Sequence, residues 1–258
     1  MPFIRHLVVA LFVCKLACHA VLAAEVMRVR VTHWPPQYFK DSNNQWTGVD
    51  VELIQAILAE AELPLEFHSL PWARAVASLR DGEIDILPTF DQTQERAAYT
   101  RWIGPQRLAT MGLVIRKGDA FVLNSLDDLV QISRSRKQLF GHQQGIFIST
   151  EFNYRLEHDD AFKRCFDIAF KEESNLAKLE RGRLLGFFEE INAARYRIQF
   201  DPKYKKLDLH DFKMTPTPTY FGVRKSLHPE TFDRIHNAYE KLERQGKLNS
   251  IRKKWGYP

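Results

Sequence analysis

The chain has 258 residues, of which 45% are hydrophobic and 27% are charged, and its formal net charge is +5. This ordinary globular mixture excludes a largely disordered chain and provides enough length for one large domain or two small ones. The positive charge is mild and evenly spread, so we expect no nucleic-acid partner.

The N-terminal segment, residues 1–24, is predicted to be a secretory signal peptide. A short basic start precedes an apolar run, and small residues offer cleavage after Ala23 or Ala24. A membrane anchor and a lipoprotein signal at Cys18 are the alternatives. Lys15 disfavours both, because it interrupts the apolar run and stands where a lipidation signal has an aliphatic residue. We therefore expect an exported, periplasmic protein.

Removal of this segment changes the cysteine count and the charge. Cys14 and Cys18 leave with it, so the mature chain keeps only Cys165 and has no internal disulfide. We expect Cys165 to be a small buried residue rather than a nucleophile. Arg5 and Lys15 leave as well, which lowers the net charge to +3 (5 − 2).

Strands and helices alternate in the first part of the mature chain. Apolar residues recur at helical spacing or alternate with polar ones, and Pro64 and Gly82 end the two helices. The predicted elements are a strand from Val26, a helix over 48–63, a strand over 65–70, a helix over 72–82 and a strand over 83–87. This alternation favours an α/β sheet with crossover connections.

A second alternating block follows a strand predicted over 108–119. Ser125 and Asp128 have the spacing of a helix start. The further predicted elements are strands over 137–143, 165–170, 183–188 and within 215–225, and helices over 148–157, 174–182, 189–197, 229–246 and 247–256. The two blocks are expected to join near 115–119, with a return crossing near 214–220.

The polar stretch Leu87–Arg96 (LPTFDQTQER) directly follows the strand predicted over 83–87. Its position at the carboxyl edge of a sheet is where α/β folds bind ligands, which favours a pocket wall over an ordinary solvated connection. We expect Thr93 to cap a short helix that carries Arg96 on its first turn.

The common signatures of enzymes are missing. The sequence contains no Gly-x-Gly and no Gly-x-Ser-x-Gly, and its histidines are scattered. We therefore expect no nucleotide cofactor, no nucleophile elbow and no metal site, and a protein that is not an enzyme. A catalytic site without a local signature stays open as an alternative.

Four segments, in this order and spacing, resemble the periplasmic solute-binding proteins of the polar amino acid type, family 3. They are residues 34–57, 70–100, 180–196 and 242–256. The resemblance implies an α/β fold of two lobes, the type II periplasmic binding protein fold, with two hinge crossovers and a ligand cleft between the lobes. It assigns residues 25–116 plus 220–258 to lobe one and residues 117–219 to lobe two.

The resemblance also implies ligand contacts in the polar stretch. The pocket arginine of the family corresponds to Arg96, whose planar guanidinium would grip a carboxylate; the alternative is a surface arginine. Thr89 corresponds to a hydroxyl donor beside the ligand. Asp91 departs from the small polar residue that is usual there. It would face the amino group of the ligand, pair with Arg96, or only hold a turn.

Three further contacts are implied outside this stretch. Trp34 and Trp72 correspond to aromatic positions that would sandwich an apolar or cationic ligand group, with packing of the lobe as the alternative. Glu190 corresponds to an acid that binds the ligand ammonium; the alternative is an acid that only favours a helix start. Lobe two departs from the family at Ile146, Phe147 and Leu185, which favours a bulkier or more apolar amino acid, or another small carboxylate.

The function implied is capture of an amino acid or related small carboxylate by a monomer that delivers it to the membrane permease of an ABC importer. Two alternatives remain on the same scaffold. One is a periplasmic enzyme of the dehydratase type, with Glu190 transferring a proton. The other is a ligand-sensing subunit for a membrane partner.

Overall fold

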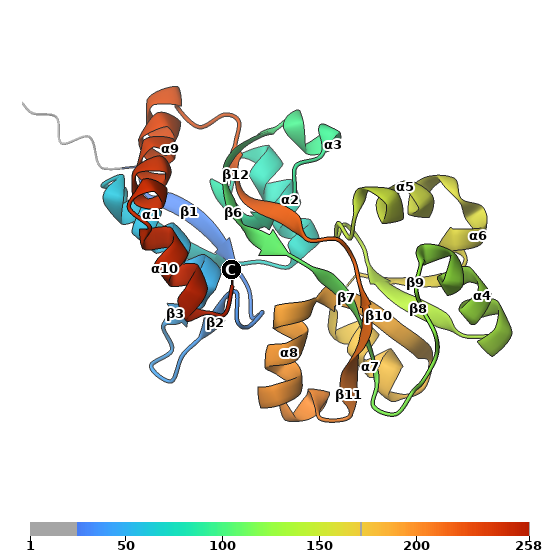
Figure 1. Cartoon of the computed structure of the whole chain (residues 1–258). Coiled ribbons are helices and arrows are strands. Elements are labelled where there is room, and N and C mark those ends of the chain that lie inside the picture. The colour runs from blue at the N-terminus through green and yellow to red at the C-terminus, as the bar shows by residue number, and fades with distance from the viewer. Residues whose placement is uncertain (1–24, 171, 258) are drawn as a thin grey trace, which may run out of the picture.

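The computed structural model describes residues 25–170 and 172–257, which form two lobes, each built on a five-stranded sheet (Figure 1). This is the two-lobe α/β architecture that the resemblance implied. The predicted signal peptide lies outside the described residues.

The first lobe contains a sheet in the order β4-β1-β5-β12-β6. Its strands are β1 (Met27–Val31), β4 (Leu65–Ser69), β5 (Ile86–Phe90), β6 (Thr100–Ala109) and β12 (Thr217–Arg224). Strand β1 pairs in parallel with β4 and β5, whereas β12 runs antiparallel to β5 and β6. A two-stranded hairpin is formed by β2 (Phe39–Lys40) and β3 (Trp46–Thr47).

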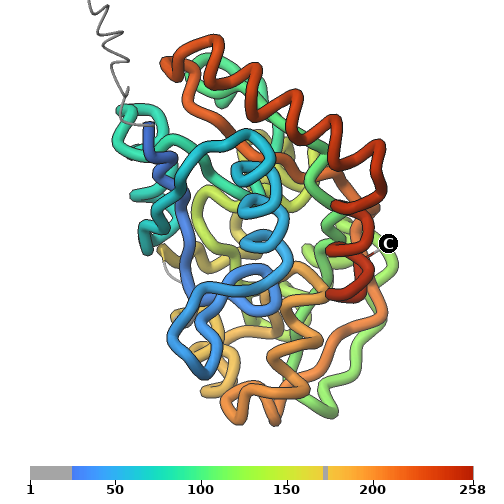
Figure 2. The backbone as a smooth tube through the Cα atoms, turned by 90° about the vertical axis from the view of Figure 1, so that its left-hand side faces the viewer, coloured from blue at the N-terminus to red at the C-terminus, as the bar shows by residue number. Residues whose placement is uncertain are grey.

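Helices from both ends of the chain bury the core of this lobe. They are α1 (Val49–Glu60), α2 (Trp72–Asp81), α3 (Gln94–Ala97), α9 (Pro229–Arg244) and α10 (Lys247–Lys254). Apolar residues of α1, α9 and α10 share one buried cluster with β1, β5 and β12. Figure 2 shows α1 beside the C-terminal helices. The C-terminal segment therefore packs on the first lobe.

The second lobe contains a sheet in the order β11-β7-β10-β8-β9. Its strands are β7 (Met111–Arg116), β8 (Leu139–Gln143), β9 (Phe166–Ala169), β10 (Leu184–Glu190) and β11 (Leu207–Lys213). Its helices are α4 (Leu126–Arg136), α5 (Thr150–His158), α6 (Asp160–Lys163), α7 (Glu172–Glu180) and α8 (Ile191–Phe200), with a 3-10 turn over Pro202–Tyr204.

Two crossings connect the lobes, and the first differs from the sequence-based expectation. Thr110 separates β6 from β7, so what was predicted as one strand over 108–119 belongs to two strands in two sheets. Because β7 pairs antiparallel with β10 and β11, residues 111–116 lie in the second lobe and not in the first. The return crossing lies between β11 and β12, and residues 217–219, which were assigned to lobe two, pair with β6 in the sheet of the first lobe.

Three predicted helix-end signals are found in the structure, whereas α1 ends at Glu60, before the predicted end at residue 63. Gly82 ends α2 in the left-handed conformation at φ 80°. The hydroxyl of Thr93 accepts a hydrogen bond from the backbone N–H of Arg96, and Ser125 and Asp128 form a capping box. These local signals fix where α2 ends and where α3 and α4 begin.

Two further features concern Cys165 and the length and polarity of the helices. Cys165 is buried, as expected, and its thiol donates to the carbonyl of Ala161. Within residues 25–170 and 172–257, no helix combines the length and apolar character that a membrane crossing requires.

Candidate functional site

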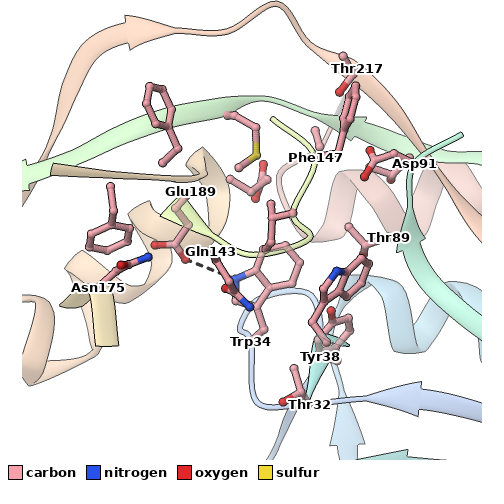
Figure 3. A pocket seen from close by; sticks show the side chains of 18 of the residues that line it. Thr32, Trp34, Tyr38, Thr89, Asp91, Gln143, Phe147, Asn175, Glu189 and Thr217 are labelled. Carbon is pink, nitrogen blue, oxygen red and sulfur yellow. Dashed lines mark hydrogen bonds between the residues drawn. The ribbon is translucent and has the colours of Figure 1, made fainter. Parts of the chain in front are cut away.

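A cavity of about 100 Å³ lies where the two lobes and their two crossings meet; we call it the inner cavity (Figure 3). Its lobe-one wall consists of Arg30, Thr32, Trp34, Tyr38, Trp72, Thr89 and Asp91. Its lobe-two wall consists of Gln143, Ile146, Phe147, Asn175, Phe187, Phe188, Glu189 and Glu190. The strand ends beside the two crossings contribute Ala109, Met111, Thr217 and Thr219. A ligand in this cavity therefore touches both lobes and both hinges.

The two predicted aromatic residues both line the inner cavity, and each donates a hydrogen bond across to lobe two. The Nε1 of Trp34 lies 3.4 Å from Oε1 of Glu189, shown as the dashed line in Figure 3. The Nε1 of Trp72 donates to the carbonyl of Gly145 at 3.0 Å. The indole rings of Trp34 and Trp72 therefore form part of the cavity wall and also contact the opposite lobe.

Thr89 lines the cavity, but its hydroxyl is already engaged within lobe one. It donates to Oδ2 of Asp50 at 2.6 Å, and Asp50 also forms a fully buried ion pair with Arg107 at 2.9 Å. The Thr89 backbone N–H donates to the side-chain carbonyl of Gln106, and the residue adopts φ 56°, which few non-glycine residues do. This network fixes the loop after β5 before any ligand arrives.

Asp91 and Arg96 form a buried pair, with Nη1 of Arg96 3.5 Å from Oδ2 of Asp91. Burial raises the pKa of Asp91 to about 6, although the adjacent Arg96 opposes this shift. Asp91 lines the inner cavity, whereas Arg96 lines a neighbouring outer hollow of about 640 Å³ between α2, α3 and α5. The Nη2 of Arg96 donates to the carbonyl of Gly145 in lobe two at 3.3 Å.

Glu190 ends β10 and caps α8 by accepting from the backbone N–H of Ala193. Its Oε2 also accepts from Nε2 of Gln37 at 2.8 Å and lies 3.4 Å from the hydroxyl of Tyr257, both in lobe one. Burial raises the pKa of this carboxyl, and Oε1 has no hydrogen-bond partner. Glu190 therefore caps a helix and lines the cavity at the same time.

The structure brings five of the six predicted site residues to the inner cavity and leaves Arg96 beside it. It also adds residues that the sequence did not single out: Arg30, Tyr38, Gln143, Asn175 and Glu189. Arg30 stood in an alternating strand and Asn175 in an amphipathic helix, where a polar residue carries no local signal. Only their long-range neighbours place them at a site.

Asn175 on the lobe-two wall has a buried side-chain oxygen that is unsatisfied. It is 2% exposed, its Oδ1 has no hydrogen-bond partner, and Figure 3 places it beside the cavity. Its Oδ1 lies 2.9 Å from the position that a Cβ on residue 141 would occupy, so glycine at Gly141 is what admits the amide. A buried amide without partners favours a group that a ligand satisfies.

Neither a metal nor a cofactor is suggested by the side chains. The described residues contain no cluster of three or more histidine, cysteine, aspartate or glutamate side chains arranged to hold a metal ion. What the cavity does offer is aromatic surface, amides and charged groups, which suits an organic ligand.

Two curated relatives match nearly the whole chain. The amino-acid-binding protein AabA of Dichelobacter nodosus is 24% identical over 269 residues, covering 100% of this chain and 99% of its own. The putative ABC transporter arginine-binding protein 2 of Escherichia coli (strain K12) is 21% identical over 255 residues, covering 97% of this chain and 98% of its own.

A solved structure with a sequence identity similar to that of these two relatives shares the fold. It is an ancestral amino acid-binding protein described as a precursor of cyclohexadienyl dehydratase, 22% identical, with a TM-score of 0.72 over 92% of this chain and 97% of that one. The family of bacterial extracellular solute-binding proteins, family 3, matches residues 27–258. The chain belongs to that family.

Proposed function

We propose that this protein captures an amino acid or a related small carboxylate in the inner cavity and delivers it to an ABC importer. The observation that supports this most is that the cavity has walls from both lobes and both crossings. A ligand held there stabilises the closed arrangement of the lobes, which is the hinge mechanism of a receptor. The names of the two relatives support an amino acid as the ligand.

In this proposal each predicted residue contacts a different part of the ligand. Arg96 grips a carboxylate at the border between the inner cavity and the outer hollow, because guanidinium and carboxylate match at two points. Trp34 and Trp72 enclose the side chain, and Glu190 and Asp91 face the amino group. Thr89 is a fixed wall, since its hydroxyl is already bound by Asp50.

The proposed setting is the periplasm, with the mature chain acting as a monomer and the permease of the importer as its partner. The membership in an extracellular family and the name of the relative from Escherichia coli support this. The predicted signal peptide would deliver the chain there.

Thermal unfolding against a panel of amino acids and small organic acids tests the proposal. A true ligand stabilises the folded protein by RT ln(1 + [L]/Kd), about 2.7 kcal/mol at a hundredfold excess over Kd. The double variant R96M/D91N, which removes both charges of the buried pair, should lose most of this stabilisation. R80A, on the exposed face of α2, is the control and should keep it. No stabilisation of the wild type by any member of the panel contradicts the proposal.

Turnover is a second candidate, because Glu190 is buried with a raised pKa and one unpartnered oxygen. A carboxyl of this kind can transfer a proton, and the fold is shared with a precursor of a dehydratase. Mass spectrometry of the ligand after incubation with the protein separates the two functions. A receptor returns the ligand unchanged, whereas an enzyme converts it and the E190Q variant does not.

A further inference from the structure

Five arginines are buried among the described residues: Arg30, Arg96, Arg107, Arg197 and Arg252. Four of them lie next to an acidic side chain. The ion pairs are Arg96–Asp91 at 3.5 Å, Arg107–Asp50 at 2.9 Å, Arg197–Glu189 at 2.5 Å and Arg252–Glu243 at 2.8 Å. Pairing is the rule for a buried charge, because an isolated one costs several kcal/mol.

Arg30 is the exception. It is 3% exposed and lines the inner cavity, yet no acidic side chain of the described residues lies within ion-pair distance of it. Its Nε donates to the carbonyl of Leu70 at 3.1 Å, and its Nη1 donates to the hydroxyl of Tyr38. Its Nη2 forms no hydrogen bond with any described residue.

Aromatic rings hold the guanidinium of Arg30 in place. Its Cζ lies 5.1 Å from the ring centroid of Tyr38 and 5.5 Å from that of Trp72. Such contacts stabilise the cation but leave its charge uncompensated. A guanidinium that is fixed by two rings, a carbonyl and a hydroxyl is preorganised to receive an anion.

The acids of the inner cavity do not supply that anion. Asp91 is paired with Arg96, and Glu189 is paired with Arg197. The third acid, Glu190, is held by the side chain of Gln37 and by the backbone of α8. None of the three acids that line the inner cavity is therefore the counter-charge for Arg30.

We propose that Arg30 binds a carboxylate of the ligand inside the inner cavity, so that the ligand carries its negative charge against the lobe-one wall between Tyr38 and Trp72. This inference rests on the proposed function, because it takes the same cavity as the ligand site. It names a second guanidinium beside Arg96, whose Cζ lies 5.8 Å from the same Trp72 ring. Arg96 is paired with Asp91 and lines the outer hollow, so Arg30 is the guanidinium that lies on the inner-cavity wall without an acidic partner among the described residues.

The test uses acetate as the simplest carboxylate and L-glutamate with its uncharged analogue L-glutamine as larger probes. Thermal unfolding of the mature chain is followed in sodium acetate and in sodium chloride of equal ionic strength and pH, and L-glutamate and L-glutamine are titrated by calorimetry. The variants are R30Q, R30K and R101Q. Arg101 is the matched control, because its guanidinium also lies over a ring, that of Phe232, and donates to a carbonyl, but outside the cavity.

We expect acetate to stabilise the wild type and R101Q relative to chloride, and this stabilisation to vanish in R30Q. The affinity for the tighter-binding carboxylate probe should fall roughly tenfold or more in R30Q, as a lost hydrogen bond to a charged partner predicts. R30K should fall less, since it keeps the charge but loses the planar fork.

Three results overturn the assignment. They are no acetate effect on the wild type, affinities of R30Q within twofold of the wild type, and equal losses in R30Q and R101Q. If R30Q fails to fold, R30K decides, and an unchanged carboxylate affinity in R30K contradicts the proposal. The proposed function fails separately, by the absence of stabilisation with the whole amino acid panel.

Discussion

The two walls of the inner cavity differ in how their polar groups are satisfied. On the lobe-one wall, Thr89 is bound to Asp50 and Asp91 is paired with Arg96. The lobe-two wall is largely apolar, with Ile146, Phe147, Phe187 and Phe188, and it holds amides at Gln143 and Asn175 that hydrogen-bond to no described residue. We infer that lobe one is a rigid platform that offers Arg30 to the ligand, and that the amides of lobe two add further groups that discriminate between ligands.

The largest expected effect comes from breaking the platform at Asp50. D50A leaves Arg107 buried without an acid and frees the hydroxyl of Thr89, so unfolding should require about 3–5 kcal/mol less. Urea denaturation measures this. The control is D119A, whose partner Arg116 is a quarter exposed, and it should cost at most about 1 kcal/mol. Equal losses in both variants would show that the lobe-one network adds no particular rigidity.

Asp91 should make stability depend on pH. Its pKa of about 6 in the folded protein exceeds the ordinary value of 3.8, so folding favours the protonated carboxyl. The resulting stabilisation is present below the lower value and is lost as pH rises through the higher one, a change of about 3 kcal/mol. The wild type should therefore lose stability relative to D91N between these two pH values. Parallel pH profiles of the two proteins would contradict the raised pKa.

On the lobe-two wall, in contrast to Asp50, replacement of a polar side chain should not destabilise the ligand-free protein. N175L replaces an unsatisfied buried amide by an apolar group of similar size, which should leave the ligand-free protein as stable or raise its free energy of unfolding by about 1–3 kcal/mol. Ligand affinity should fall, because leucine cannot form the hydrogen bond that we expect the Asn175 amide to make with the ligand. Denaturation and calorimetry give the two readouts. A destabilised variant with unchanged affinity would identify Asn175 as a structural residue.

The smallest effect is expected far from both walls. Lys254 on α10 contacts Glu52 on α1 at 2.8 Å, but its side chain is 62% exposed. Because solvent screens such pairs, K254A should change the free energy of unfolding by less than about 1 kcal/mol and leave ligand affinity unchanged. A larger loss in urea denaturation would mean that the docking of the C-terminal helices depends on charge and not on apolar packing.

Local sequence patterns predicted most helices and their ends, as Gly82 and Thr93 illustrate. They missed β6, since Gly104 and Pro105 interrupt it and a proline argues against a strand. The proline is tolerated because β6 is at the edge of its sheet. Strand β11, the edge of the other sheet, was missed as well. The other two edge strands, β4 and β9, were predicted, so an edge position alone does not explain these misses.

The candidate site was predictable only where a family motif marks it. The resemblance pointed to Trp34 and Glu190, which line the cavity. Arg30 could not be found in this way. It stands out only because no acidic side chain of the described residues lies near it in space, and the sequence does not show spatial neighbours. Asn175 is comparable, since its role depends on Gly141, a residue 34 positions away (175 − 141) on another element.

The central claim is that a small carboxylate binds between the two walls. A crystal structure of the complex with the tightest-binding member of the amino acid panel tests it most directly. The account predicts the ligand in the inner cavity, in contact with Trp34 of lobe one and Phe187 of lobe two, with its carboxylate on Arg30 or Arg96. A ligand bound only in the outer hollow, or in contact with one lobe alone, would contradict it.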